Sequence, residues 1–493
     1  MGSLDYLTRH LEWEAVSFPV TLTQIEFEDG FLPVGSGYSI TLWRNYNYKM
    51  TGSIIGYTID IRSLRETKPP IEGNIIKGHW VKGRDEAGNL FALSECYITT
   101  YSVQGVQNTT GEYAFDGGLF VDDCAVFFNN PPAEGEKKAL YWYLSGDSPV
   151  WMTGITIRKP SAPKPKIRRG FDEFDDSVEN ILGSSSSKDF MPIAVNGFRC
   201  FVAEVPKALL PDWAYGYCIE FRDDAINGIS SKQREGIENF LSFLFGTELK
   251  RVGSSVLIDN ALVNCRLINN TAISSTAFKQ PAFPPIAFNR EYEWGNPAWL
   301  VERLLPTYLR LHESLPMRGV LSRYFTALKL PVGINLPLFA NALEILADDY
   351  LKYKGGYIKQ YLPDEEFVGL IEEELKTIKK KLSGVAESEI IFNKIKGANK
   401  KGPAEKLNSF FSMCGIAIGK KEKKAMQLRN IMTHSKRDYQ KEKNAHEDVI
   451  HTRVYQSLLN RVLLHLMGYE EYYTDYSLPA TTVKKVSKSA GKD

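Results

Sequence analysis

Near its carboxyl end the chain reads NAHEDVIHTRVYQSLLNRVLLHLM, from Asn444 to Met467. Apolar residues recur there at helical spacing and Gly468 follows as a terminator: Val449, Val454, Leu458, Val462 and Leu466. Leu459, Leu463 and Met467 form a second apolar line beside the first. An apolar face this wide predicts a long helix that is buried on two sides.

Helical patterns continue upstream of this segment as far as Pro297. We expect helices at residues 297–328 (broken near Pro316), 336–353, 364–382, 404–417, 420–434 and 444–467. The segment Gly384–Gly402 has no helical signal and is expected to be a basic loop. The sequence therefore predicts a helical domain over 296–475, followed by a basic flexible tail over 476–493.

The first part of the chain, residues 1–157, is expected to be β-rich. Residues 49–60 and 90–102 are dense in β-branched and aromatic side chains, and turn-forming residues separate them. Short strands at this spacing are typical of a sandwich or an open barrel.

Residues 158–290 are expected to form a mixed α/β second part of the same region. Three prolines in 159–169 predict a linker or surface loop, and serines 184–187 predict a flexible stretch. Residues 198–204 and 252–258 resemble strands, whereas Ser230 and Gln233 form a capping box for a helix that ends at Gly246. The fold class predicted for the chain is α+β multidomain.

Composition and charge exclude several classes of protein. The chain has 493 residues, 43% hydrophobic and 24% charged, and its best apolar run, Ile334–Ala347, is too short to span a bilayer. The amino terminus carries charges where a signal peptide has an apolar core. We therefore expect a cytoplasmic protein with no membrane partner.

The six cysteines lie at least 18 residues apart, which predicts reduced core residues. We expect neither a metal site nor a cofactor.

The charges are distributed unevenly along the chain. Residues 376–443 contain 18 Lys or Arg against 6 Asp or Glu, a net charge of +12 in a chain whose overall charge is +1. Such a segment is typical either of a local polyanion site or of a solvated lysine face on a helix.

One short segment, KKEKKAMQLRNIMTHSKRD from Lys420 to Asp438, combines residue types suited to a reaction. Ala425, Leu428 and Met432 are spaced to face a helical core, whereas Asn430 and His434 share another face. Arg429 and His434 are five residues apart, about 140° around a straight helix. They can meet on one ligand only if the helix ends or bulges near Thr433, or if a second chain completes the site.

These residue types suit metal-free cleavage of RNA. The guanidinium of Arg429 matches phosphate oxygens, and the imidazole of His434 can take a proton from a ribose 2′-hydroxyl or give one to a leaving oxygen. Because the 2′-oxygen of RNA is itself the nucleophile, neither a metal ion nor a covalent intermediate is needed. Lys423, Lys424, Lys436 and Arg437 flank the pair and are expected to line an RNA path.

The segment RNIMTH, followed by a long terminal helix, resembles the signature of HEPN domains (higher eukaryotes and prokaryotes nucleotide-binding). The wider layout, a β-rich half before a helical module, resembles the ApeA family of bacterial anti-phage proteins, which act by abortive infection. The motif carries the specific part of this resemblance, and the amino-terminal half matches in layout alone. Ser435 stands where a small residue, often Gly, follows the motif histidine.

This resemblance implies a metal-independent endoribonuclease whose site is shared between two protomers. Arg429 would bind phosphate, Asn430 would be the motif's polar residue, and His434 would be the catalytic base or acid. The expected partners are RNA, with transfer RNA as the substrate, and a second copy, in a homodimer or higher homo-oligomer joined through the helical domain. A phage-derived trigger is expected at the amino-terminal region, which would be the sensor or regulatory part.

Two other functions fit the same residues. In one, a non-catalytic nucleic-acid or nucleotide-binding module uses Arg429 and His434 only to recognise phosphate. In the other, the helical region is a dimerisation unit and the β-rich half binds a protein or carbohydrate ligand. His446 and His451 are expected to lie on the surface of the last helix, and His465 in its core or at an interface.

Overall fold

The fold was analysed in a computed structural model of the chain. It describes residues 16, 18–28, 31–32, 35–45, 48–58, 78–105, 113–146, 154–159, 166–169, 174–177, 185–195, 198–205, 210, 214–222, 229–259, 261–269, 282–286, 297–331, 334–355, 360–385, 387–434, 442–477 and 482–487. The chain forms two compact units: Met1–Pro284 with Phe288–Pro306, and Pro285–Ala287 with Thr307–Asp493. A β-rich half over residues 20–268 precedes a region of about eight helices over 298–466, which confirms the predicted fold class.

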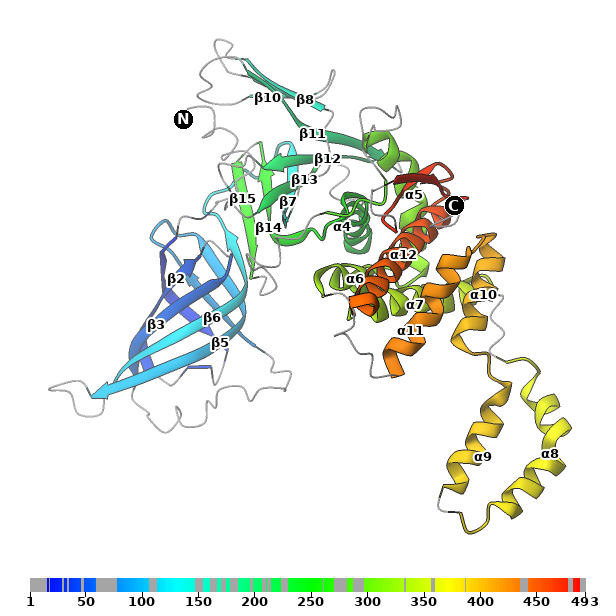
Figure 1. The fold of residues 1–493 in the computed structure, drawn as a ribbon. Helices are drawn as coiled ribbons and strands as arrows, with labels where there is room; N and C mark the ends of the chain where they lie inside the picture. Colours follow the sequence, from blue (N-terminus) through cyan, green and yellow to red (C-terminus); the bar gives the residue numbers. More distant parts are fainter. Residues whose placement is uncertain are drawn as a thin grey trace. The chain divides into compact units, whose positions relative to one another are not determined.

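The first unit begins with a closed barrel of six antiparallel strands (Figure 1). Its strands are β1 (Val20–Phe27), β2 (Gly35–Arg44), β3 (Met50–Thr58), β4 (His79–Arg84), β5 (Leu90–Gly105) and β6 (Tyr113–Phe127). The pairing runs β1–β2–β3–β6–β5–β4, and β4 returns to β1 to close the ring. The segments expected at 49–60 and 90–102 are β3 and β5.

Alternation along these strands builds the core of the barrel. Ile40 on β2 pairs with Ile54 on β3, and both side chains are fully buried. Leu119 and Val121 on β6 continue the same interior, because every second residue of a strand faces one side. Closure leaves the barrel without a free edge between β1 and β4.

A second stretch of antiparallel sheet continues from β6. In spatial order it contains β15 (Ala261–Ile268), β14 (Lys250–Ile258), β7 (Lys137–Ser145), β13 (Tyr215–Arg222), β12 (Phe198–Val205), β11 (Ser185–Val195), β8 (Gly154–Lys159), β9 (Lys166–Arg169) and β10 (Phe174–Ser177). The helix α4 (Ser231–Phe245) packs on this sheet, where the Tyr143 hydroxyl donates to Glu238 and the Tyr217 and Phe245 rings meet.

The ends of α4 follow the predicted capping chemistry. The Ser230 side chain accepts from the Gln233 backbone, the Gln233 side chain accepts from the Ser230 backbone, and Gly246 ends the helix at φ 70°. The expected strands at 198–204 and 252–258 are β12 and β14.

Two expectations for this region are wrong. The expected linker 159–169 contains β9, and the expected flexible serine stretch begins β11. The expected division of the region at residue 157 falls between β7 and its two partner strands, β13, which pairs with Lys138–Ser145, and β14, which pairs with Lys137–Leu144. These pairings join segments about a hundred residues apart, so local composition does not reveal them.

The helical region contains α5 (Pro297–Ser314), α6 (Met317–Lys329), α7 (Asn335–Tyr353), α8 (Asp364–Lys381), α9 (Ser388–Lys396), α10 (Pro403–Cys414), α11 (Lys420–His434) and α12 (Glu442–Leu466). The break near Pro316 is confirmed. The expected basic loop at 384–402 is wrong, because it contains α9 and the short 3-10 helix η2 (Gly397–Asn399). No helix among the described residues is both long and apolar enough to cross a membrane.

Helix α12 packs against α7, α11 and β16. Val454, Leu458 and Val462 are fully buried, and so are Leu459 and Leu463 on the second apolar line, which confirms the prediction of a helix buried on two sides. Gly468 follows at φ 78°, in the left-handed region that favours glycine.

The segment after α12 forms a small hairpin of β16 (Tyr472–Asp475) and β17 (Thr482–Lys485). The prediction of a flexible tail from residue 476 is therefore wrong for 482–487, where Val486 is buried. The end of the tail, residues 488–493, lies outside the described residues.

Candidate functional site

Helix α11 carries the motif, and its sequence explains its extent. Its residues are mostly strong helix formers, and neither Gly nor Pro interrupts them. At its start the Gly419 backbone N–H donates to Glu422 Oε2 at 2.8 Å, while Lys423 N donates to Gly419 O at 3.0 Å. A carboxylate in the first turn also interacts favourably with the helix dipole.

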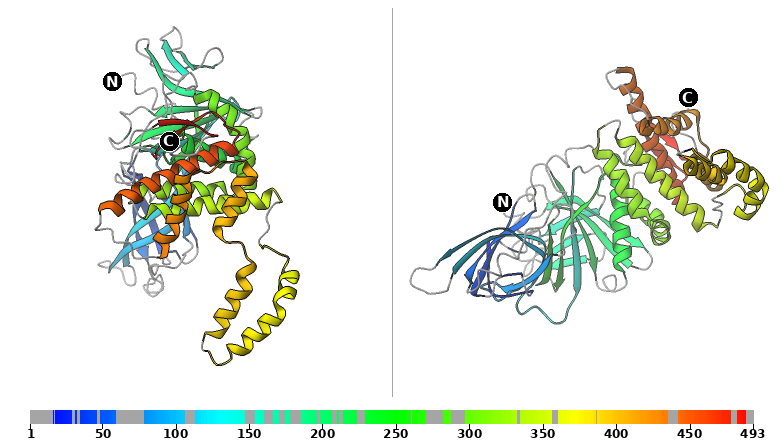
Figure 2. Two further views of the ribbon diagram at one scale, coloured as in Figure 1. Left: turned by 45° about the vertical axis from the view of Figure 1, so that its right-hand side comes forward. Right: turned by 90° about the horizontal axis from the view of Figure 1, so that it is seen from below.

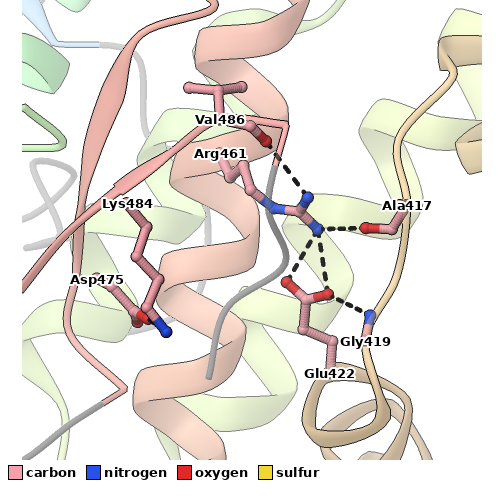
Figure 3. A network of polar contacts seen from close by, with 7 residues as sticks. All are labelled: Ala417, Gly419, Glu422, Arg461, Asp475, Lys484 and Val486. Atoms are coloured by element: carbon pink, nitrogen blue, oxygen red, sulfur yellow. Dashed lines mark hydrogen bonds and ion pairs between the residues drawn. The ribbon is translucent and has the colours of Figure 1, made fainter. Parts of the chain in front are cut away.

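Glu422 also anchors α11 to α12 (Figure 3). Arg461 Nη2 lies 2.9 Å from Glu422 Oε1 and 3.1 Å from Glu422 Oε2, and both side chains are almost fully buried. Arg461 donates as well to Ala417 O at 2.9 Å and to Val486 O at 3.4 Å. One guanidinium therefore joins the start of α11, the last two turns of α12 and the residue after β17.

A second ion pair supports the same region. Lys484 Nζ on β17 lies 3.2 Å from Asp475 Oδ2 on β16, and the Asp475 carboxylate is buried. Burial raises the pKa of the Tyr473 hydroxyl far above its ordinary value, Asp475 raises it further, and Arg461 lowers it. The hairpin thus sets buried polar groups beside the Glu422–Arg461 pair.

Apolar packing fixes the rotation of α11 about its own axis. Ala425 and Leu428 are buried, as predicted from their spacing, and α11 packs against α12 and α7. On the opposite side Lys423 and Gln427 are exposed. The helix therefore has a defined inner and outer face over its first nine residues.

The motif occupies the last two turns of this helix. The backbone is α-helical from Lys420 through His434, with Arg429, Asn430 and His434 in it. The side chains of these three residues lie outside the described part of the structure, as do Lys436 and Arg437 entirely. Of the predicted RNA-binding residues, Lys423 and Lys424 are described, and both are exposed.

Helical geometry places the motif positions on different faces. The positions of Asn430 and His434 follow Lys423 by seven and eleven residues, so they continue its exposed line within about 20°. The position of Arg429 follows the buried Glu422 by seven residues and continues that line instead, within about 20°. The expected spread between Arg429 and His434, about 140°, holds as long as the helix is continuous, and the backbone is helical through His434.

Three other histidines of this unit are described. His465 Nε2 lies 2.8 Å from Cys414 O, and His446 is exposed, as predicted for both. The prediction of a surface His451 is wrong: its exposed fraction is 6%, because it lies on the same face of α12 as the buried Tyr455. Among the described residues no group of three His, Cys, Asp or Glu side chains could hold a metal ion.

The Glu422–Arg461 anchor was missed by sequence reasoning. A signal was present, since Asn460-Arg461 interrupts the apolar run LLNRVLL, where a charge needs a buried partner. The partner could not be identified, because 39 residues separate it from Arg461.

Comparison of the chain with known protein families, with curated proteins and with solved structures gives no match.

Proposed function

We propose that the chain is a metal-independent endoribonuclease of the HEPN type that acts in anti-phage defence by abortive infection, with transfer RNA as its substrate. Arg429 is the proposed phosphate-binding residue, His434 the proton-transfer residue and Asn430 the polar residue between them. The β-rich half is the proposed sensor of a phage-derived trigger. This proposal rests on the motif RNIMTH and its resemblance to HEPN domains.

The structural observation that best supports the proposal is the exposed outer face of α11. Lys423 and Gln427 are exposed on one line of the helix, and the positions of Asn430 and His434 continue it. A lysine on the same line as a histidine and an amide suits a phosphodiester, because cations bind the phosphate while the imidazole moves the proton.

The inner face supports a site made by two chains. Glu422 and Arg461 hold the first turn of α11 in one rotation, and the position of Arg429 lies on the same inner line as Glu422. A single straight helix therefore does not bring Arg429 and His434 to one phosphate. A two-fold related second copy can supply the missing residue, because the same patch of both copies meets across such an axis.

Expression in a bacterial host, followed by sequencing of RNA ends, tests the activity. We expect new RNA ends with the wild type and with His446→Ala, a matched control that removes an exposed histidine of α12. His434→Ala should leave the host RNA intact. New ends of equal abundance with His434→Ala would refute the assignment, whereas RNA binding without any cleavage would support a non-catalytic binding module.

Mixing purified Arg429→Ala chains with His434→Ala chains tests the sharing of the site. If one Arg429 and one His434 from opposite chains form a working half-site, the mixture regains activity that neither variant has. If both pairs are needed, each variant instead inhibits the wild type when added in excess. A fully active monomer would contradict the two-chain site.

A further inference from the structure

Helices α8 and α9 form a hairpin that stands away from the other helices of its unit in Figure 1 and in the left view of Figure 2. Hydrogen bonds join the residues just before α8 to Asn399, which follows α9, and so close the base of the hairpin. Tyr361 N donates to Asn399 O at 2.9 Å, and the buried Asn399 side chain exchanges two hydrogen bonds with the Leu362 backbone, at 2.9 and 2.8 Å. The hairpin therefore projects from an ordered base.

This hairpin exposes large apolar side chains on both helices and on the turn between them. Their exposed fractions are 44% for Val368, 64% for Leu370, 45% for Val385, 57% for Ile390 and 37% for Ile391. One stripe of α8 is less exposed: Leu375 is buried, and Phe367, Ile371 and Ile378 on the same face are half-buried. Apolar residues gathered on a projecting element are typical of a contact surface.

The order of charged residues along α8 indicates which kind of partner can bind this hairpin. The first eleven residues of the helix contain six acids and no base, and its last six contain four lysines and no acid. The helix dipole favours such an order only within the first and last turns. Glu372, Glu373 and Glu374 lie more than a turn beyond the start, so the dipole does not account for them.

One exposed line of α8 carries charges of both signs together with one of these apolar residues, Val368. Glu365, Val368, Gly369, Glu372, Lys376 and Lys379 follow one another at helical spacing, and all are exposed. Within one chain Glu372 pairs with Lys376 at 2.7 Å, with both side chains more than half exposed. A Cβ added at Gly369 would meet no atom of the described residues within 4 Å, apart from the backbone of its own helix, so no described contact requires a glycine there. A glycine at this point lets a second helix come close.

We propose that this line of α8 binds the same line of a second copy of the chain, with the two helices antiparallel. A two-fold axis between Glu372 and Lys376 puts Glu372 of each copy beside Lys376 of the other, with the acidic half of α8 against the basic half. A parallel contact would oppose like charges. An RNA or an anionic membrane would be repelled by the six acids, so the charge order selects a second copy.

Charge exchange tests the contact in the full-length protein. The acidic variant carries Lys376→Glu, Lys379→Glu and Lys380→Glu, and the basic variant carries Glu365→Lys, Glu366→Lys and Glu372→Lys. Each alone should be monomeric, with a dimer dissociation constant raised by about a hundredfold or more, because like charges then oppose each other across the contact. An equimolar mixture of the two should form a heterodimer with the mass of two chains.

Sedimentation equilibrium gives the masses, and circular dichroism shows that each variant keeps its helices. Recovery in the mixture cannot come from unfolded chains. A monomeric wild type, variants that remain dimeric, or a mixture that stays monomeric would each overturn the proposal.

The matched control is Lys423→Glu with Lys424→Glu, two exposed lysines of α11. This control should leave the dimer intact, and dissociation by it alone would assign the contact to α11 instead. The outcome is decided by the mass of the protein in solution, so it does not depend on the proposed nuclease activity.

Discussion

Replacing one partner of the Glu422–Arg461 pair should loosen α11 strongly. Both side chains are almost fully buried, and the pair is closed by contacts of 2.9 and 3.1 Å. Removing one member of a buried pair leaves an uncompensated charge and costs about 3–5 kcal/mol. The opening equilibrium of α11 should therefore shift by roughly 10²-fold to 4 × 10³-fold.

The two single variants should differ in their response to pH. In Arg461→Met the Glu422 carboxylate can relieve its buried charge by taking up a proton, so the loss of stability should shrink as the pH falls. In Glu422→Gln the guanidinium of Arg461 stays charged at every accessible pH, so the loss should persist. The double variant Glu422→Leu with Arg461→Met should recover most of the loss, because neither charge remains buried.

Hydrogen–deuterium exchange of the amides of α11 and of β16–β17 measures this effect locally, without requiring the whole chain to unfold in one step. Lys352→Ala is a suitable control, since it removes a surface ion pair with Asp349 that contributes little. Exchange rates in Glu422→Gln within a factor of about ten of the wild type would refute the assigned role of the pair.

Three further predictions concern other parts of the chain. Lys423→Ala should weaken RNA binding and reduce its logarithmic salt slope by about 0.7 to 0.9. Lys424→Ala, about 100° away around the helix, should change the slope less. Equal effects of the two variants in filter binding would show that the exposed line of α11 does not guide RNA. Burial raises the pKa of Glu238 despite the hydrogen bond from Tyr143, so its stabilising contribution is full below the unfolded pKa and is lost as the pH rises through the folded pKa. Glu238→Gln should therefore melt above the wild type by a margin that is smallest below the unfolded pKa of about 4.3 and grows as the pH rises through the folded pKa. A constant margin in thermal melts would exclude this cause. Gly369→Ala should stabilise α8 by about 1 kcal/mol in a monomeric background, slowing local amide exchange, because it removes a glycine from a helix interior without a clash; unchanged exchange would contradict this.

Local patterns in the sequence predicted most of the helices. The bounds of α11 were predicted as 420–434, and α12 was predicted within two residues, because helical periodicity needs only neighbouring residues. Helix α9 was missed because it is short and because three of its apolar residues, Ile390 to Phe392, are consecutive, which gives no clear helical spacing. Strands β9 and β17 were missed because four residues give no clear alternation and their partners are fixed by the fold.

Contacts between residues far apart in the chain could not be predicted from the sequence. The barrel is closed by pairing between β1 and β4, which are about sixty residues apart. The ion pair between Glu422 and Arg461 joins residues 39 positions apart. The motif itself could be located from residue types and spacing. The division of α11 into an inner line through Glu422 and an outer line through Lys423 became visible only when burial was known.

The most direct test of the proposed function is RNA cleavage by the purified protein in excess EDTA. The proposal predicts cleavage that leaves 2′,3′-cyclic phosphate ends, with His446→Ala as active as the wild type. His434→Ala should be slower by about a hundredfold or more while melting close to the wild type, because the proton-transfer group is lost and the fold is not. Cleavage that requires a divalent metal ion, or equal rates for His434→Ala and the wild type, would contradict the account.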